Sequence, residues 1–306
     1  NVLCKAFGEY VEHIYGTPHM PATELKRRLD AGEKIVIMDS RTPHEFHNFS
    51  VPGAYCAPGA DVVHRFATVV PDADTTVIIN CAGRTRSIIG AQSVINAGVP
   101  NKVYALENGT MAWLMEGYKL ASGTVNAPPQ PKGEALKRAE EAGARVAARF
   151  GVKRIDRAGL AKLQGEAEKR SVYILDVRTL EEYEAGHLPG ARWAPAGQVV
   201  QALDEWVGTF NARIVLADNA DAVRATMTAS WLIQIGVAEV FVLPMAAGES
   251  GLEKGADRWP LAAPPPAVET IEVGAARTAV DAGSVTVIDL GPGSRYRGGH
   301  IPGACF

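Results

Sequence analysis

One cysteine in this sequence stands where a nucleophile would be expected. Cys81 follows an apolar, β-branched run at residues 77–80 and precedes a segment of helical pattern at residues 87–98, so it falls in the turn between a strand and a helix. Backbone N–H groups in such a turn, together with the helix N-terminus, form a cradle that attracts negative charge. The cradle favours the thiolate, which is the reactive form of a cysteine side chain.

The residues after Cys81 support the same chemistry. Arg84 and Arg86 supply cations close to the sulfur, and Gly83 can adopt positive φ and let an anionic group approach the backbone. A buried, unreactive thiol is the commonest fate of a lone cysteine. A glycine, two arginines and a helix-starting Ser87 directly after the cysteine favour catalysis over that alternative. We therefore predict that Cys81 is a catalytic nucleophile.

Two charged residues lie near the end of an earlier apolar run. Asp39 ends the run at residues 35–39, and Arg41 follows two positions later. Charges at a strand end are usually paired, so we predict an Asp39–Arg41 ion pair that supports the Cys81 loop, with Glu45 in the same network. Arg41 is also a candidate contact for an anion.

A pattern that contains Pro-Gly-Ala occurs three times in the same register, at residues 41–54, 178–191 and 291–304. Each copy follows an apolar, strand-like run that ends in aspartate. The copies begin 137 residues apart (178 − 41) and then 113 residues apart (291 − 178). This is the spacing of whole domains rather than of solenoid repeats, so the sequence predicts tandem domains.

Pro-rich segments mark the joints between these domains. In the first domain, short apolar strands alternate with helical segments, which predicts an α/β fold with a mainly parallel sheet and a site at the carboxyl ends of its strands. The predicted organisation is a connector from an upstream domain at 1–19, a domain with Cys81 at 20–125, a Pro-rich linker and helix at 126–151, a degenerate domain at 152–261, a linker at 262–267 and the N-terminal part of a third domain at 268–306.

Several motifs taken together resemble a rhodanese domain. They are the Asp39–Arg41 run, the Val51–Ala54 turn, the Cys81–Ser87 loop, the Leu106–Trp113 segment and, in the third copy, Gly299–Gly303. The resemblance covers nearly the whole chain and is to the bacterial sulfurtransferases that carry several rhodanese domains. It implies tandem rhodanese-like domains, each a small, mainly parallel sheet flanked by helices.

The resemblance also implies a reaction. The Cys81 thiolate would take the outer sulfur of a thiosulfate-like or persulfide donor, hold it as a persulfide and pass it to a thiol, a cyanide-like acceptor or a protein. No metal and no organic cofactor is implied. The residues that would bind the substrate are Ala82, Gly83, Arg84, Thr85, Arg86 and Ser87.

Two other functions are weighed against sulfur transfer. Cysteine phosphatases, including those on this fold, have a longer loop, whereas four residues separate Cys81 from Arg86, and a shorter loop offers fewer donors to phosphate. The second alternative is a non-catalytic array of modules that bind anions or partners. The best-known thiosulfate enzymes carry basic residues directly after the nucleophile, where this chain has Ala82 and Gly83, so the sequence leaves the donor open.

The second domain lacks the cysteine. Aligning Arg86 with Arg224 places Asn219 at the position of Cys81, and a shift by one residue offers only Asp218. Neither side chain can hold a persulfide, so we predict a catalytically silent domain with a packing, regulatory or docking role. The third copy ends before its loop.

The remaining cysteines and histidines receive weaker predictions. Cys56 occupies an apolar position of the repeat and is predicted in the core, whereas Cys4 could be a resolving thiol only if exposed, and Cys305 has no supporting chemistry. His187 and His300 are predicted as structural hydrogen-bonding residues at the repeat position of Ser50. Surface positions are predicted for His44, His47 and His64.

Composition restricts the remaining possibilities. A formal net charge of −3 and a pI near 6.2 give no general attraction to nucleic acid or anionic membranes. No apolar run approaches the roughly 20 residues that span a bilayer. The four cysteines are widely spaced, which disfavours a metal or disulfide framework and suits a reducing compartment, so we predict a cytoplasmic location. The oligomeric state is not predicted.

Overall fold

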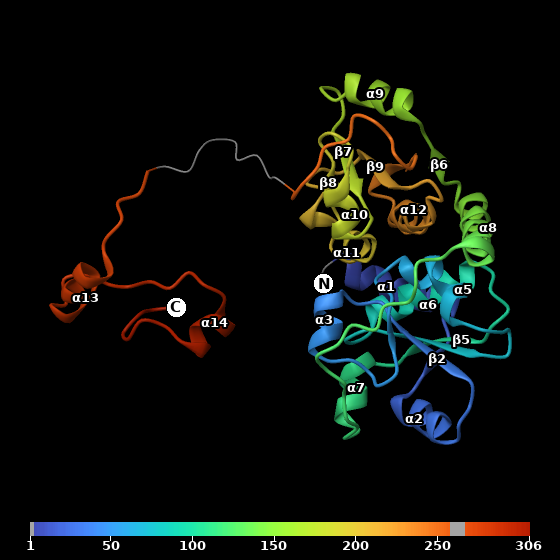
Figure 1. Cartoon of the computed structure of the whole chain (residues 1–306), viewed down its shortest axis with the longest axis horizontal. Helices are drawn as coiled ribbons and strands as arrows, with labels where there is room; N and C mark the ends of the chain where they lie inside the picture. Colours follow the sequence, from blue (N-terminus) through green and yellow to red (C-terminus); the bar gives the residue numbers. More distant parts are fainter. Residues whose placement is uncertain (1–2, 258–266) are drawn as a thin grey trace. The chain divides into compact units, whose positions relative to one another are not determined.

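The computed structural model describes residues 3–257 and 267–306. The chain divides into two compact units, residues 1–257 and residues 258–306, which are described separately. Most of the predicted linker at 262–267, and the end of the domain before it, fall outside the described residues. The first unit contains both complete copies of the repeat (Figure 1).

The first copy folds around a five-stranded parallel sheet. In the order of pairing, its strands are β1 (His19–Met20), β5 (Val103–Leu106), β4 (Thr76–Asn80), β2 (Ile35–Asp39) and β3 (Tyr55–Cys56). All five residues of the central strand β4 are buried, as expected for a parallel strand covered on both faces. The carboxyl ends of β2 and β4 therefore meet at one edge of the sheet.

Helices connect these strands and cover the sheet. They are α2 (Ala22–Asp30), α3 (Pro43–Asn48), α4 (Asp61–His64), α5 (Phe66–Val69), α6 (Thr85–Asn96) and α7 (Gly109–Met115). Helix α3 begins with a capping box, in which Thr42 and Glu45 satisfy each other's backbone N–H groups. Because that box fixes the first turn of α3, it also fixes the position of the Glu45 carboxylate.

The second copy repeats the same topology. Its parallel sheet has the order β6 (Lys153–Arg154), β10 (Ala238–Met245), β9 (Ala212–Asn219), β7 (Val172–Asp176) and β8 (Arg192–Trp193). Its helices are α9 (Arg157–Gly165), α10 (Leu180–Ala185), α11 (Ala196–Gln201), the 3-10 helix η1 (Leu203–Glu205) and α12 (Val223–Ile235). The two copies are therefore tandem α/β domains with the same strand order.

Two helices pack against both domains. Helix α8 (Gly133–Phe150) packs against α12 of the second domain and against α4 and α5 of the first, and α1 (Leu3–Tyr15) packs against α6 and α11 (Figure 1). Apolar residues of both domains share one buried cluster. A polar link between the domains is a 2.8 Å hydrogen bond from the Trp231 indole to the Ser93 hydroxyl. The domains are thus packed together through a common core.

A close backbone approach between the domains involves two glycines. A Cβ atom on Gly59, which has a φ of +51°, would lie 2.3 Å from the backbone nitrogen of Gly197. A Cβ atom on Gly197 would lie 2.8 Å from Cα of Gly59. Real Cβ atoms do not approach other atoms so closely, so both positions require glycine.

The second unit contains α13 (Val273–Asp281) and α14 (Gly293–Gly298). A parallel bridge pairs Ile288 with Cys305. Most side chains of this unit are exposed. The assignment of residues 268–306 to a third domain stays a prediction, as do the other domain boundaries.

Candidate functional site

Cys81 occupies the position that the sequence predicts. It directly follows β4 and lies in the turn before α6, which begins at Thr85, so the local order is strand, turn, helix. The cysteine is buried, with 2% of its surface exposed, whereas Ala82 and Gly83 are half-buried and Arg84 is exposed. The thiol therefore sits at the base of a loop whose next residues reach the surface.

The start of helix α7 holds the backbone of this loop. The Thr110 N–H donates to the Cys81 carbonyl at 2.9 Å, and the Met111 N–H donates to the Ala82 carbonyl at 3.2 Å. Gly109 has a φ of +54°, and a Cβ atom there would lie 2.1 Å from the Cys81 carbonyl oxygen. Gly109 is a site residue that sequence reasoning missed as such, although the Asn-Gly pair at 108–109 signals a left-handed turn.

Arg86 is fixed by a carboxylate from helix α3. Its two terminal nitrogens donate to the two oxygens of Glu45, each at 2.7 Å. Burial would raise the pKa of Glu45, but the hydrogen bonds and charge of Arg86 hold it at about 2. Burial would lower the pKa of Arg86, yet Glu45 and the nearby Cys81 raise it above the usual range. Arg86 is therefore a permanent cation close to the sulfur.

Arg84 points to a different partner. Its guanidinium forms an ion pair with Glu12, which lies on helix α1 and is 72 positions away in the sequence. Hydrogen bonding to Glu12 raises the pKa of Arg84. The structure thus places Arg84 at the loop, as expected, but with a carboxylate beside it that sequence reasoning did not anticipate.

The predicted ion pair behind the loop is present. Asp39 and Arg41 are both fully buried, and Arg41 Nε and Nη2 donate to the Asp39 carboxylate at 2.9 and 2.8 Å. The Asn80 side chain donates to Asp39 at 2.6 Å, and Arg41 Nη2 donates to the Phe49 carbonyl at 2.7 Å. These bonds join the ends of β2 and β4 to the end of α3.

Two polar residues complete the loop. The Ser87 hydroxyl donates to the Arg84 carbonyl at 2.8 Å, so it stabilises the turn rather than reaching out of it. The Thr85 side chain lies against Gly8 of α1, where a Cβ atom would come within 2.3 Å of the Thr85 methyl group. Helix α1 therefore contacts the loop directly.

The loop of the second domain is aligned differently from the sequence prediction. Asp176 pairs with Ala217 just as Asp39 pairs with Asn80, so Asp218, and not Asn219, occupies the place of Cys81. The prediction of Asn219 was wrong because it counted back from the helix alone. Five residues lie between Asp218 and Arg224, one more than between Cys81 and Arg86.

Asp218 fills the anion cradle of its own domain. One carboxylate oxygen accepts hydrogen bonds from the Asn219 N–H at 2.8 Å and from Arg224 Nε at 3.0 Å, and the other accepts from the Ala225 N–H at 2.9 Å. The residue is completely buried. Burial raises the pKa of Asp218, while the charge of Arg224 opposes that shift. A side chain of the protein itself thus occupies the place where an anion would bind.

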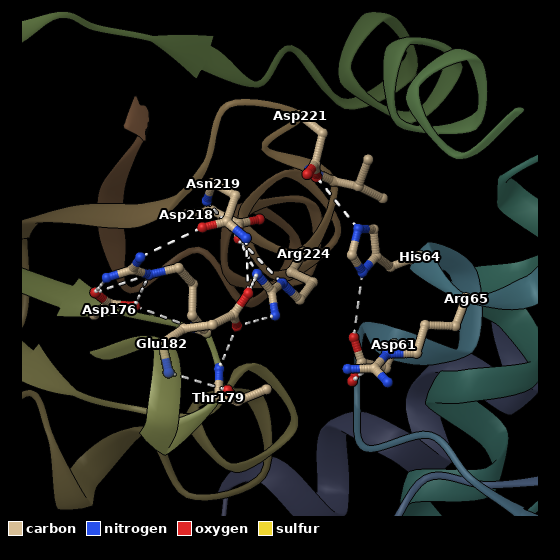
Figure 2. Close-up of polar contacts among 12 residues, drawn as sticks. Asp61, His64, Arg65, Asp176, Thr179, Glu182, Asp218, Asn219, Asp221 and Arg224 are labelled. Carbon is tan, nitrogen blue, oxygen red and sulfur yellow. Dashed lines mark hydrogen bonds and ion pairs between the residues drawn. The ribbon is translucent and has the colours of Figure 1, made fainter. Parts of the chain in front are cut away.

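A chain of charges extends from this loop into the first domain (Figure 2). Asp221 lies 3.5 Å from His64 Nε2, and His64 Nδ1 lies 3.5 Å from Asp61, which also pairs with Arg65 at 3.3 Å. The surface prediction for His64 was wrong, because only 3% of this residue is exposed. Burial would lower the pKa of His64, but Asp221 and Asp61 raise it to about 9.

The other cysteines and histidines lie in the core, at the surface or in ring stacks. Cys56 is buried in the core as predicted, and burial raises the pKa of its thiol to about 12. Cys305 is free and exposed, whereas the side chain of Cys4 lies outside the described part of the structure. His187 stacks on Tyr183 with 3.8 Å between the ring centroids, and the Tyr296–His300 pair repeats this arrangement.

The residues that the structure describes were searched for metal-binding groups and for membrane-spanning helices. Within them, no group of three or more His, Cys, Asp or Glu residues is arranged to hold a metal ion. No helix in the same part of the chain has the length and apolar character needed to cross a membrane.

Comparison with known proteins identifies the family. The model of the rhodanese-like domain matches residues 21–116 and again residues 159–245, which together are more than half of the chain. This protein therefore belongs to the rhodanese-like domain family. The predicted tandem rhodanese fold is confirmed.

One solved structure resembles the chain over almost its whole length. The thiosulfate sulfurtransferase from Pseudomonas aeruginosa is 45% identical and superposes with a TM-score of 0.88, over 99% of this chain and 57% of that one. The present chain thus spans less than two thirds of that relative. A search of curated proteins gives no match.

Two further solved structures align less well with this chain. The Alr3790 protein from Anabaena sp. is 25% identical, with a TM-score of 0.31 over 34% of this chain and 80% of that one. SseA from Escherichia coli, described as a 3-mercaptopyruvate sulfotransferase, is 17% identical, with a TM-score of 0.33 over 76% of this chain and all of that one. Similarities of this size say nothing about activity.

Proposed function

We propose that this chain is a sulfurtransferase that carries sulfane sulfur on Cys81. The observation that carries the proposal is the setting of the thiol at the end of β4, directly before α6, in a short loop closed by Arg86. A half-buried cation beside a cysteine at a helix start favours the thiolate. The similarity to a thiosulfate sulfurtransferase over 99% of the chain supports the same conclusion.

The reaction consists of two displacements at sulfur. The Cys81 thiolate attacks the outer sulfur of the donor, a new S–S bond forms, and the donor's own bond to that sulfur breaks. The bonding electron pair leaves with sulfite when the donor is thiosulfate, or with a thiolate when it is a persulfide. An acceptor thiolate or cyanide then attacks the outer sulfur of the Cys81 persulfide and releases the Cys81 thiolate.

The loop residues would have different roles in this reaction. The backbone of residues 82–87 would surround the persulfide, and Arg86 would stabilise its negative charge because burial strengthens the interaction. Arg84 would meet the incoming donor at the exposed rim. Asp39 and Arg41 would act as supports, because their bonds join the strand ends beneath the loop.

The proposal also includes the partners of the protein and its location in the cell. The partners would be a small anionic sulfur donor and a thiol, a cyanide-like molecule or a protein as acceptor, without metal or organic cofactor. Cys56, Cys81 and Cys305 are all free thiols, which suits a reducing compartment such as the cytoplasm. Residues 268–306 would begin a third rhodanese-like domain.

Mass spectrometry tests the proposal directly. After incubation with thiosulfate or a persulfide donor, the protein should gain one sulfur atom, and peptide mapping should place that atom on Cys81. Cys81→Ser should abolish both the adduct and turnover, whereas Cys305→Ser, which removes an exposed thiol, should leave both intact. An unchanged mass of the unsubstituted protein with every donor would overturn the proposal.

A further inference from the structure

Both arginines of the Cys81 loop are paired with carboxylates. Glu45, from within the domain, holds Arg86 with two hydrogen bonds of 2.7 Å. Glu12, from helix α1, holds Arg84. The half-exposed rim of the site, where Arg84 lies, therefore carries much less net positive charge than the sequence of the loop suggests.

Helix α1 is anchored so that Glu12 has a defined position. The Phe7 ring meets the Trp231 ring edge to face, with 6.0 Å between the centroids. The Tyr15 hydroxyl donates to the Gln234 side chain at 2.7 Å. Both partners belong to α12 of the second domain, and Val11 of α1 is buried, with 1% of its surface exposed. The silent domain thus helps to hold the helix that carries Glu12.

The side chains of Glu12 and Arg84 differ in exposure, and the difference matters for binding. The Arg84 side chain is 54% exposed, whereas that of Glu12 is 20% exposed. A donor approaching the loop from solvent therefore meets a cation whose charge is already compensated by a fixed carboxylate behind it. Repulsion by that carboxylate grows in proportion to the negative charge of the donor.

We propose that Glu12 is a specificity-determining residue that makes the Cys81 site favour sulfur donors with a single negative charge over thiosulfate, which has two. The inference rests on the sulfur-transfer function proposed above and extends it to the class of donor. Monoanionic organic persulfides and thiosulfonates are the chemical class that fits. Neutralising Glu12 should free Arg84 to bind the donor and remove a repulsive charge from the rim.

Two donors that differ by one charge make the inference measurable. In thiosulfate and in methanethiosulfonate, the Cys81 thiolate attacks the outer sulfur, and the S–S bond of the donor breaks. Its electron pair leaves with sulfite from thiosulfate and with methanesulfinate from methanethiosulfonate. Because the bond changes are the same and the intrinsic reactivities of the two donors cancel between variants, the change in the ratio of the two kcat/KM values on substitution of Glu12 reports the effect of donor charge.

The decisive variant is Glu12→Gln, measured at low ionic strength with both donors. From Coulomb's law in a water-like dielectric, kcat/KM should rise about five- to tenfold for thiosulfate and about two- to threefold for methanethiosulfonate. The difference should shrink in roughly 0.5 M salt, where exposed charges are screened. Glu12→Lys should shift the ratio further in the same direction.

Glu134→Gln is the matched control. Glu134 pairs with Arg138 on the exposed face of α8, so this variant loses the same charge and the same type of ion pair away from α1. Its kcat/KM ratio should equal that of the unsubstituted protein. Thermal unfolding curves of both variants check that the fold is retained, and only a change at the rim should alter the preference between donors.

The outcomes separate the two proposals. Sulfur transfer to Cys81 with an unchanged ratio in both Glu12 variants would overturn the role of Glu12 and leave the proposed function standing. A change of the ratio in Glu134→Gln as large as that in Glu12→Gln would overturn the role of Glu12 in the same way. If neither donor places sulfur on Cys81 of the unsubstituted protein, the proposed function fails and the inference fails with it.

Discussion

The two domains of the first unit share a fold but differ in the residue that lies in the anion cradle of each loop. Cys81 and Asp218 occupy the same place at the end of the central strand, and Arg86 and Arg224 pair with equivalent glutamates, Glu45 and Glu182. In the first domain we propose that the cradle receives an external anion, the sulfur donor. In the second, the carboxylate of Asp218 occupies it.

This difference shows that the cradle can be retained without the cysteine. Arg224 is buried, and a buried cation without a partner is strongly destabilising. Asp218 supplies the required negative charge from within the chain. The loop that would bind a substrate in one domain is therefore a folding element in the other, and it also provides Asp221 for the contact with His64.

Among the changes that test this comparison of the two domains, Asp218→Ala should have the largest effect on the free energy of unfolding. Removing this carboxylate takes away one of the two acids that are hydrogen-bonded to the buried Arg224 and leaves Glu182, and we expect the free energy of unfolding to fall by about 3–5 kcal/mol. Denaturant unfolding measures the loss. Sulfate or phosphate should restore part of it by entering the vacated cradle, and the unsubstituted protein, measured with the same salts, controls for their general stabilising effect. If these anions stabilise the variant no more than they stabilise the unsubstituted protein, the Asp218 carboxylate does not occupy an anion-binding cradle.

A smaller effect is expected from pH at the contact between the domains. The pKa of His64 is raised to about 9, so its contribution is complete below the usual value of about 6.5 and is lost as the pH rises through 9. The charged groups that face it are Asp61 on its own helix, and Asp221 and Arg224 from the second domain.

We expect this contribution to be on the order of 2 kcal/mol. The measurement is the free energy of unfolding from pH 6 to about pH 10 for the unsubstituted protein and for His64→Gln. The difference between the two should shrink as the pH passes 9. A difference that stays constant across this range would show that the histidine is uncharged in the folded protein.

The smallest effect concerns the capping boxes that both domains share. Thr42→Ala and Thr179→Ala remove equivalent helix caps, and each should lower the free energy of unfolding by about 1 kcal/mol. Only Thr42→Ala should also reduce sulfur transfer, by a few-fold, because α3 positions Glu45 and through it Arg86. Equal activity losses in the two variants would contradict this assignment.

The sequence was sufficient for features that depend on neighbouring residues. The strand before Cys81, the turn and the following helix are visible in a short stretch of apolar periodicity, glycine and arginine. The Asp39–Arg41 pair was also predictable, because the two residues are adjacent to one strand end. The tandem fold followed from the repeat, since one motif in the same register requires one supersecondary structure.

Features that depend on distant parts of the chain were not predictable in this way. Glu12 reaches Arg84 because α1 packs on α6, and His64 is buried where α4 packs on α12 of the second domain, on α6 and on α8. The misplacement of Asn219 has a third cause. The extra residue lies between Asp218 and Arg224, and only the pairing of β7 with β9 shows the register of the strand before it.

The contact between Gly59 and Gly197 has a consequence for how these domains can be exchanged. Each glycine leaves room for the backbone of the other. The shape of each domain surface at this contact therefore depends on the residue that the other domain places there. A rhodanese domain transplanted into either position would need a glycine at the same point to dock in the same way. Homologues in which one of these glycines carries a side chain should therefore hold their two domains at a different angle or distance.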